Sequence, residues 1–127
     1  MVPRTVLVVD DSLIVAMKLT NLLTELDFKV LGTASTGSQA VELYEKLHPD
    51  LVTMDITMPD MNGIEATRRI VALDPNALIV MVTSHGQEDM VMDAIDAGAK
   101  GYVLKPFRKD KLADHIEQIF KRYAPSV

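Results

Sequence analysis

The sequence predicts an α/β fold in which helices cover both faces of a parallel sheet, a three-layer, doubly wound sandwich. Short runs rich in Val, Leu and Ile alternate five times with segments whose apolar residues recur at helical spacing. Strands separated by helices run parallel, because each crossover returns the chain to the same end of the sheet. Some of the runs, such as residues 78–82, are continuously apolar, which is typical of strands covered on both faces.

Each expected element has its own signal in the pattern. The strands, recognised as short apolar runs, are residues 4–9, 28–34, 51–54, 77–82 and 102–104. The helices that follow them carry apolar residues at helical spacing, within 15–26, 40–47, 64–71, 91–98 and 112–123. Ser12 can cap the first helix, Asn62-Gly63 opens the third, and Asp74-Pro75 ends it.

Length and composition limit the class of protein. A chain of 127 residues fits one domain, and 48% hydrophobic residues are enough to form a core. The absence of cysteine excludes disulfides and thiolate metal sites. A net charge of −5 argues against an extended nucleic-acid footprint. Because the sequence has no signal-peptide pattern and no apolar run of about 18 residues, we expect a cytoplasmic protein that does not enter a membrane.

Polar side chains follow four of the expected strands at the point where each strand ends. They are Asp10 and Asp11 after the first strand, Asp55 after the third, Thr83 after the fourth and Lys105 after the fifth. The carboxyl ends of parallel strands form one edge of the sheet, so we expect these side chains to lie close together. Three carboxylates repel one another unless a cation lies between them, and such oxygen ligands suit Mg²⁺.

The same residues predict phosphoryl transfer to a carboxylate. A carboxylate can act as a nucleophile and form an aspartyl-phosphate, whose equatorial oxygens then need a metal, an ammonium or a hydroxyl beside them. Asp55 is the candidate nucleophile because it stands alone on the central strand. The acid pair Asp10 and Asp11 is placed to hold the metal, and Lys105 and Thr83 can contact the phosphoryl oxygens.

These residues also have simpler explanations. The two aspartates at 10 and 11 can serve only to complement the dipole of the first helix, Thr83 can cap a strand end, and Lys105 can be a surface lysine. Their convergence at one edge of the sheet favours a site over these explanations. Solvated or capping roles, not metal binding, are expected for the histidines, which lack the spacing of ligands: His48, His85 and His115. Met90 and Met92 flank the apolar stripe of the fourth helix and are expected to be partly exposed.

The motifs resemble those of the receiver domains of two-component signalling. The matching pieces are VLVVDDS at 6–12, DITMPDMNG at 55–63, VTS at 82–84 and GYVLKPF at 101–107, and their spacing covers nearly the full chain. The resemblance implies a flavodoxin-like sheet of five strands in the order 2-1-3-4-5. It also implies that residues 1–127 are a single receiver domain with no output domain.

The resemblance assigns roles around the metal. It makes Asp55 the acceptor of a phosphoryl group from a histidine kinase. It implies that Mg²⁺ is held by Asp10, Asp11, Asp55 and the backbone carbonyl of Thr57. The side chains of Thr57 and His85 flank the site at positions that vary across the family and govern how fast the phosphate is lost, so the lifetime of the phosphorylated state is not implied.

The resemblance also assigns roles to the strand ends beyond the metal. Thr83 and Lys105 would contact the phosphoryl group, and Tyr102 would be a rotamer switch coupled to Thr83. The Lys105–Pro106 peptide bond is expected to be cis. The surface that changes would be the face formed by the fourth helix, the fifth strand and the fifth helix.

We therefore expect a binding switch that catalyses only its own phosphorylation and dephosphorylation. By resemblance, the leading expectation is a role in chemotaxis with the flagellar motor switch as the downstream target. A phosphate-shuttling or kinase-regulating receiver, or the receiver fragment of a larger regulator, is the alternative.

Two other classes of protein share parts of this pattern. A phosphatase of the haloacid dehalogenase type would have a second Asp two residues after the nucleophile, where this sequence has Thr57, and a cap domain. A flavodoxin-like flavin carrier would have a phosphate loop rich in Ser, Thr and Gly after the first strand, where Asp10-Asp11 would repel a phosphate. The receiver interpretation fits the sequence better than either.

Overall fold

The protein was analysed as a computed structural model, which describes residues 3–84 and 88–123. His85, expected beside the site, lies outside these residues. The strands are β1 Thr5–Val9, β2 Lys29–Ala34, β3 Leu51–Asp55, β4 Ile79–Thr83 and β5 Gly101–Leu104. The helices are α1 Leu13–Glu25, α2 Gly37–Leu47, α3 Gly63–Leu73, α4 Glu88–Ala97 and α5 Lys109–Tyr123. The expected alternation of strands and helices is confirmed.

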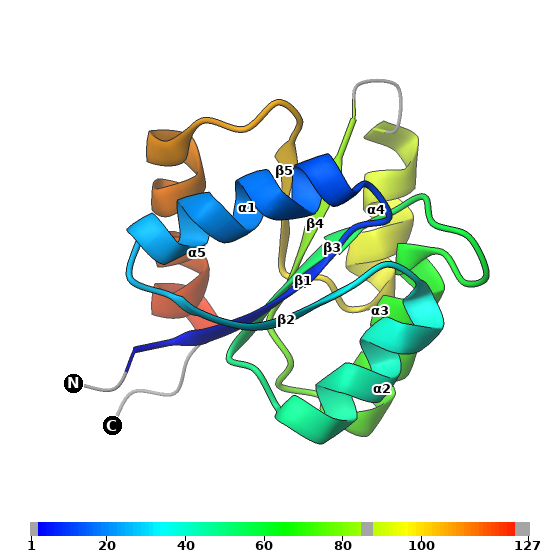
Figure 1. The fold of residues 1–127 in the computed structure, drawn as a ribbon. Helices are drawn as coiled ribbons and strands as arrows, with labels where there is room; N and C mark the ends of the chain where they lie inside the picture. The colour runs from blue at the N-terminus through cyan, green and yellow to red at the C-terminus, as the bar shows by residue number, and fades with distance from the viewer. Residues whose placement is uncertain (1–2, 85–87, 124–127) are drawn as a thin grey trace.

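All five strands form one parallel sheet in the order β2-β1-β3-β4-β5, which confirms the order implied by the resemblance (Figure 1). The chain moves outward from β1 to β2 and then crosses back to β3 on the other side of β1. The loops that follow β1 and β3 therefore leave toward opposite faces of the sheet. Such a reversal opens a crevice at the carboxyl ends of the strands, which is where the polar residues were predicted to meet.

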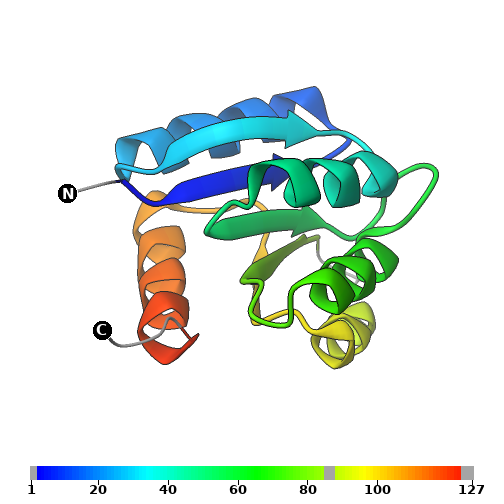
Figure 2. The same cartoon turned by 90° about the horizontal axis from the view of Figure 1, so that it is seen from below.

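The helices form two layers, with α1 and α5 on one face of the sheet and α2, α3 and α4 on the other (Figures 1 and 2). Alternation along β1 supplies both faces: Val6 and Val8 pack with α1 and α5, whereas Leu7 and Val9 pack with the opposite layer. All four side chains are at most 1% exposed. Each face of the sheet thus has its own apolar core, and the two cores hold the strands in place.

Local signals set the helix boundaries as predicted. Ser12 caps α1 and accepts a hydrogen bond from the backbone nitrogen of Val15 at 3.3 Å, and Asn62 caps α3. The C-cap of α3 is Asp74, as expected. The expected starts of β1, β2 and β5 differ from the structure by one residue, and the largest error is at β4, which begins at Ile79 and not at residue 77. The backbone nitrogen of Ala77 donates to the carbonyl of Asp74 at 3.0 Å, so the first apolar residues of this run belong to a turn.

The histidines and the methionines of α4 were expected to lie at or near the surface. His48 ends α2 in the left-handed conformation with φ 46°, the capping role that was expected. His115 is neither solvated nor a cap: it is half-buried, and its buried Nε2 makes no hydrogen bond within the part of the chain that the structure describes. Met92 is 64% exposed and Met90 half-buried, as predicted.

Over residues 3–84 and 88–123, no helix has both the length and the apolar character to cross a membrane.

Candidate functional site

Four strand ends bring the predicted side chains to one edge of the sheet. In the strand register Val9 pairs with Met54 and Asp55 pairs with Val82, so β1, β3 and β4 end at nearly the same level. Asp10 comes directly after β1, and Asp55 is the last residue of β3. The register of the parallel sheet therefore confirms that these residues converge.

A cluster of three carboxylates lies at this edge. One carboxylate oxygen from each of Asp10, Asp11 and Asp55 lies within 4.8 Å of the other two. Asp10 and Asp55 are buried, with 3% and 5% exposure, whereas Asp11 is exposed. The backbone nitrogen of Ser12 donates to Asp10 Oδ1 at 2.9 Å, which orients that carboxylate. A half-buried set of oxygen ligands, open to solvent on the side of Asp11, matches what Mg²⁺ binds.

Lys105 is the cation beside the cluster. Its Nζ lies 3.2 Å from Asp10 Oδ2 and 3.5 Å from Asp55 Oδ1. Asp10 Oδ2 is buried and has this ion pair, but it receives no hydrogen bond from the described residues. When all groups are ionised, three negative charges and one positive charge leave a net charge of −2. One divalent cation would balance that charge, so the residues present fit Mg²⁺.

The protonation of Asp55 reflects this crowding. Burial, and next the negative charge of Asp10, raise the pKa of Asp55 to about 7, although the ammonium of Lys105 opposes both effects. A hydrogen bond with Asp11 raises the pKa of Asp55 further. The carboxyl at the centre of the site therefore holds a proton near neutral pH, and a bound cation would favour its release.

Thr83 and Lys105 are joined through the backbone at the ends of β4 and β5. The backbone nitrogen of Lys105 donates to the carbonyl of Thr83 at 2.7 Å, and the Lys105–Pro106 bond is cis, as expected. Thr83 is fully buried, and its Oγ1 makes no hydrogen bond to any described residue. A buried hydroxyl without a partner costs roughly 1–3 kcal/mol, so this site favours a ligand that accepts a hydrogen bond, such as a phosphoryl oxygen.

Two predicted residues lie at the margin of the site. Thr57 is exposed, two residues after Asp55, and its role as a carbonyl ligand stays a prediction. Tyr102 is 45% exposed and pairs with Met81, two positions before Thr83 in β4. It borders a cavity of about 420 Å³ that Phe107 also lines. The coupling between Tyr102 and Thr83 therefore stays a prediction as well.

Gly63 is a residue of the site that sequence reasoning missed. A Cβ atom at this position would lie 1.9 Å from the backbone oxygen of Asp55, so no larger residue fits without displacing the backbone of Asp55. The nitrogen of Gly63 donates to the carbonyl of Ile56 at 2.7 Å. The Asn-Gly pair was interpreted as a helix start and as the end of the motif at 55–63, and neither interpretation gave Gly63 a role in the approach to Asp55.

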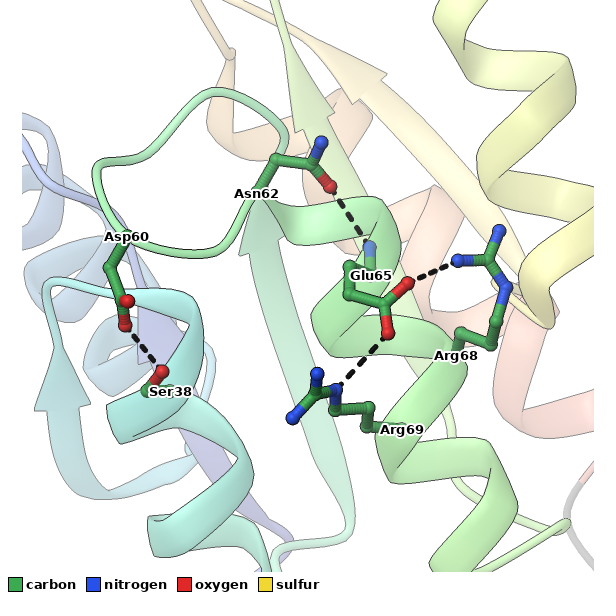
Figure 3. A network of polar contacts seen from close by, with 6 residues as sticks. All are labelled: Ser38, Asp60, Asn62, Glu65, Arg68 and Arg69. Carbon is green, nitrogen blue, oxygen red and sulfur yellow. Dashed lines mark hydrogen bonds and ion pairs between the residues drawn. The ribbon is translucent and has the colours of Figure 1, made fainter.

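A polar network beside the site was also missed (Figure 3). Ser38 in the first turn of α2 donates to the carboxylate of Asp60, in the loop between β3 and α3. Further along, Asn62 accepts from the backbone nitrogen of Glu65 at 2.9 Å. The carboxylate of Glu65 binds two guanidinium groups, those of Arg68 and Arg69. The loop after Asp55 is thus held by α2 at Asp60 and by the start of α3 at Asn62.

Comparison with known proteins places this geometry in context. The family described as response regulator receiver domain matches residues 6–117. The chain is 44% identical over 118 residues to the chemotaxis protein CheY of Thermotoga maritima, which covers 93% of this chain and 98% of that protein. It is 45% identical over 114 residues to protein CcdB of Bacillus subtilis, covering 90% and 95%.

A solved structure is similar along nearly the whole chain. It is the crystal structure of the CheX-CheY-BeF3-Mg+2 complex from Borrelia burgdorferi, with a chain 36% identical to this one and a TM-score of 0.89. The match covers 94% of this chain and 90% of that chain.

Proposed function

This chain belongs to the response regulator receiver family, and on that basis we propose that it is a phosphorylation switch whose acceptor is Asp55. The observation that carries the proposal is one buried carboxylate that adjoins two further carboxylates, an ammonium and a buried hydroxyl without a partner among the described residues. Each of these groups has a use in phosphoryl transfer to a carboxylate, and together they have little structural purpose.

The proposed metal ligands are the carboxylates of Asp10, Asp11 and Asp55 and the backbone carbonyl of Thr57. The all-oxygen donor set and the net charge of −2 support Mg²⁺ over a softer metal. When bound, Mg²⁺ supplies positive charge that offsets the carboxylates and the phosphoryl oxygens. The CheX-CheY complex from Borrelia burgdorferi contains Mg²⁺ together with a chain similar to this one, which supports the same ion here.

In the proposed reaction, a carboxylate oxygen of Asp55 attacks the phosphorus of a phosphohistidine on a histidine kinase. The new P–O bond forms as the P–N bond breaks, and the imidazole leaves as the neutral ring. Lys105, which already lies 3.5 Å from Asp55 Oδ1, pairs with one phosphoryl oxygen, and the Thr83 hydroxyl donates to another. The chain itself then catalyses only the gain and loss of this one group.

The proposed output is protein binding on the face formed by α4, β5 and α5. Phosphorylation of Asp55 replaces a single negative charge with a group that carries about −1.5 to −2 charges and three strong acceptor oxygens. When Thr83 turns to donate to one of them, it leaves space that Tyr102 can fill from its exposed position. The same face carries the exposed side chains of Met92 and Ile95, at 64% and 38%, which a partner would cover.

We place this switch in chemotaxis, with the flagellar motor switch as the leading target, because a similar protein is named a chemotaxis CheY. The complex of a similar chain with CheX supports protein partners in general. A phosphate-shuttling or kinase-regulating receiver is the alternative, because the identity to protein CcdB, whose name does not mention chemotaxis, is as high as the identity to CheY.

Labelling with acetyl phosphate in the presence of Mg²⁺ tests the acceptor. The parent protein should take up one phosphate per chain in a hydroxylamine-sensitive form, and Asp55→Asn should take up none. Asp114→Asn, an equal change of charge at an exposed position on α5, is the matched control and should label like the parent. Full labelling of Asp55→Asn would refute the acceptor, and release of many phosphates per chain would indicate a phosphatase.

A further inference from the structure

We propose that Ser38, through its hydrogen bond to Asp60, is a positioning residue for the Mg²⁺ site. The element it positions is the β3–α3 loop, residues 56–62. The inference rests on the proposed function, because it concerns the metal site proposed above. It adds that α2, which contributes no ligand, sets the affinity of that site.

The contact joins two segments that are distant in sequence. Ser38 Oγ donates to Asp60 Oδ2 across a separation of 22 residues (Figure 3). The contact is exposed to solvent, so the bond contributes little to the core. Its effect is therefore local, on the shape of the loop that begins directly after Asp55.

The loop needs such a restraint at Asp60. This residue has φ 73°, in the left-handed region that residues other than glycine rarely adopt. Asp is among the residues that tolerate this region best. The hydrogen bond from Ser38 holds the side chain of Asp60 and so favours this conformation over the extended one that Asp60 would otherwise prefer.

A second contact acts on the next residue of the loop. A Cβ atom at Gly37 would lie 2.2 Å from the backbone oxygen of Met61, so the first residue of α2 rests directly on the loop backbone. This end of α2 is itself fixed, because Thr36 accepts from the backbone nitrogen of Gln39 at 3.1 Å. Two successive residues of α2 thus hold two successive residues of the loop, and the helix acts as a fixed support.

Backbone contacts connect α2 to two members of the carboxylate cluster, Asp55 and Asp10. At the far end of the loop, Gly63 donates to Ile56 and lies against the backbone of Asp55. On the other side, the backbone nitrogen of Asp10 donates at 3.0 Å to Ala34, the last residue of β2 before the turn into α2. The two ends of the loop that carries Thr57 are therefore joined beside Asp55. The turn from β2 into α2 contacts Asp10, and α2 contacts the loop. A change at Ser38 should shift Thr57 relative to the carboxylates.

Titration of the full chain with MgCl₂ by isothermal calorimetry, together with metal-free melting, tests the proposal. Ser38→Ala should weaken Mg²⁺ affinity by about threefold to tenfold, below the 10–100-fold typical for partners that bind a metal ligand directly. The metal-free Tm should change little, and Ser38→Thr should restore most of the affinity. Ser35→Ala is the matched control, because Ser35 lies beside the same turn and its hydroxyl bonds to Gln39 instead of the loop. It should bind Mg²⁺ like the parent.

Asp60→Gly separates positioning from general stability. Glycine adopts φ 73° without strain, so this variant should melt no lower than the parent, yet it should bind Mg²⁺ more weakly because the Ser38 contact is lost. The NMR resonance of the Thr57 amide should shift in both Ser38→Ala and Asp60→Gly before metal is added. If both variants bind Mg²⁺ as the parent does, the positioning role is refuted and the proposed function stands. If the parent binds no Mg²⁺, the proposed function fails and this inference with it.

Discussion

Replacing Asp55 with Asn should make the metal-free protein more stable at pH 8, although it removes the proposed acceptor. The substitution keeps the size of the side chain and removes a charge that is buried beside two other carboxylates. The folded protein raises the pKa of this group from 3.8 to about 7, so the folded state binds the proton more tightly than the unfolded chain does. Stability from this group is therefore complete below about pH 4 and is lost as the pH rises to about 7.

The size of the effect follows from that difference. About three pH units at 1.36 kcal/mol each give roughly 4 kcal/mol as the cost of ionising Asp55 in the folded state. Asn also loses the ion pair with Lys105, which at 3.5 Å and low exposure offsets part of this gain. We expect a net gain of about 2–3 kcal/mol at pH 8, which raises the Tm of a domain of this size by roughly 10 °C.

Urea unfolding of the parent and Asp55→Asn, in EDTA at pH 4 and at pH 8, measures this effect. The gain should be present at pH 8 and nearly absent at pH 4, where Asp55 is protonated in the folded parent. Asp114→Asn should show no such pH dependence, because its side chain is exposed. If Asp55→Asn is no more stable than the parent at pH 8, or gains the same stability at both pH values, then the ionised Asp55 carboxylate does not destabilise the folded protein.

Two further predictions concern the metal and the switch. Asp11→Ala should reduce the stabilisation that Mg²⁺ gives the parent, which is about 2.7 kcal/mol at a Mg²⁺ concentration one hundred times the Kd, and should slow labelling by acetyl phosphate. The rise in Tm with Mg²⁺ measures this effect, and a rise equal to the parent's would remove Asp11 from the site. Thr83→Ala should still be labelled on Asp55 but should gain little partner affinity on phosphorylation, because a ligand shifts an equilibrium only through unequal contacts with the two states. Partner affinity is measured with and without phosphorylation. If it rises equally in Thr83→Ala and in the parent, the coupling between Thr83 and the binding surface is contradicted.

The fold and the convergence of the strand-end residues could be predicted because both depend on local patterns. Parallel strands must end on one edge, so Asp10 and Asp55 had to meet once their strands were identified. The strand order came from the resemblance, since periodicity alone does not decide which strands are neighbours. The late start of β4 was missed because Ala77 is apolar, although its backbone closes a turn with Asp74.

What the sequence could not predict depends on contacts between distant segments. His115 is half-buried because Gly101, on the strand beneath it, has no side chain; a Cβ atom there would lie 2.7 Å from His115 Nε2. The contact of Ser38 with Asp60 depends on how α2 packs beside the β3–α3 loop, and no local pattern at either residue signals it. Such pairs become visible only when the tertiary structure places the segments side by side.

Among the described residues, Lys105 is the lysine beside the three aspartates, and its charge limits how much phosphorylation of Asp55 would change the net charge of this region. Three carboxylates, one ammonium and one divalent ion sum to zero, and an aspartyl-phosphate replaces the single negative charge of Asp55 with about two. Phosphorylation therefore changes the net charge of the region by only about one unit. At physiological salt, a charge of that size is screened within about 8 Å. If the output is protein binding on the α4–β5–α5 face, as proposed, a partner there would detect a change of shape at residues such as Tyr102, and its preference for the phosphorylated form should depend little on ionic strength.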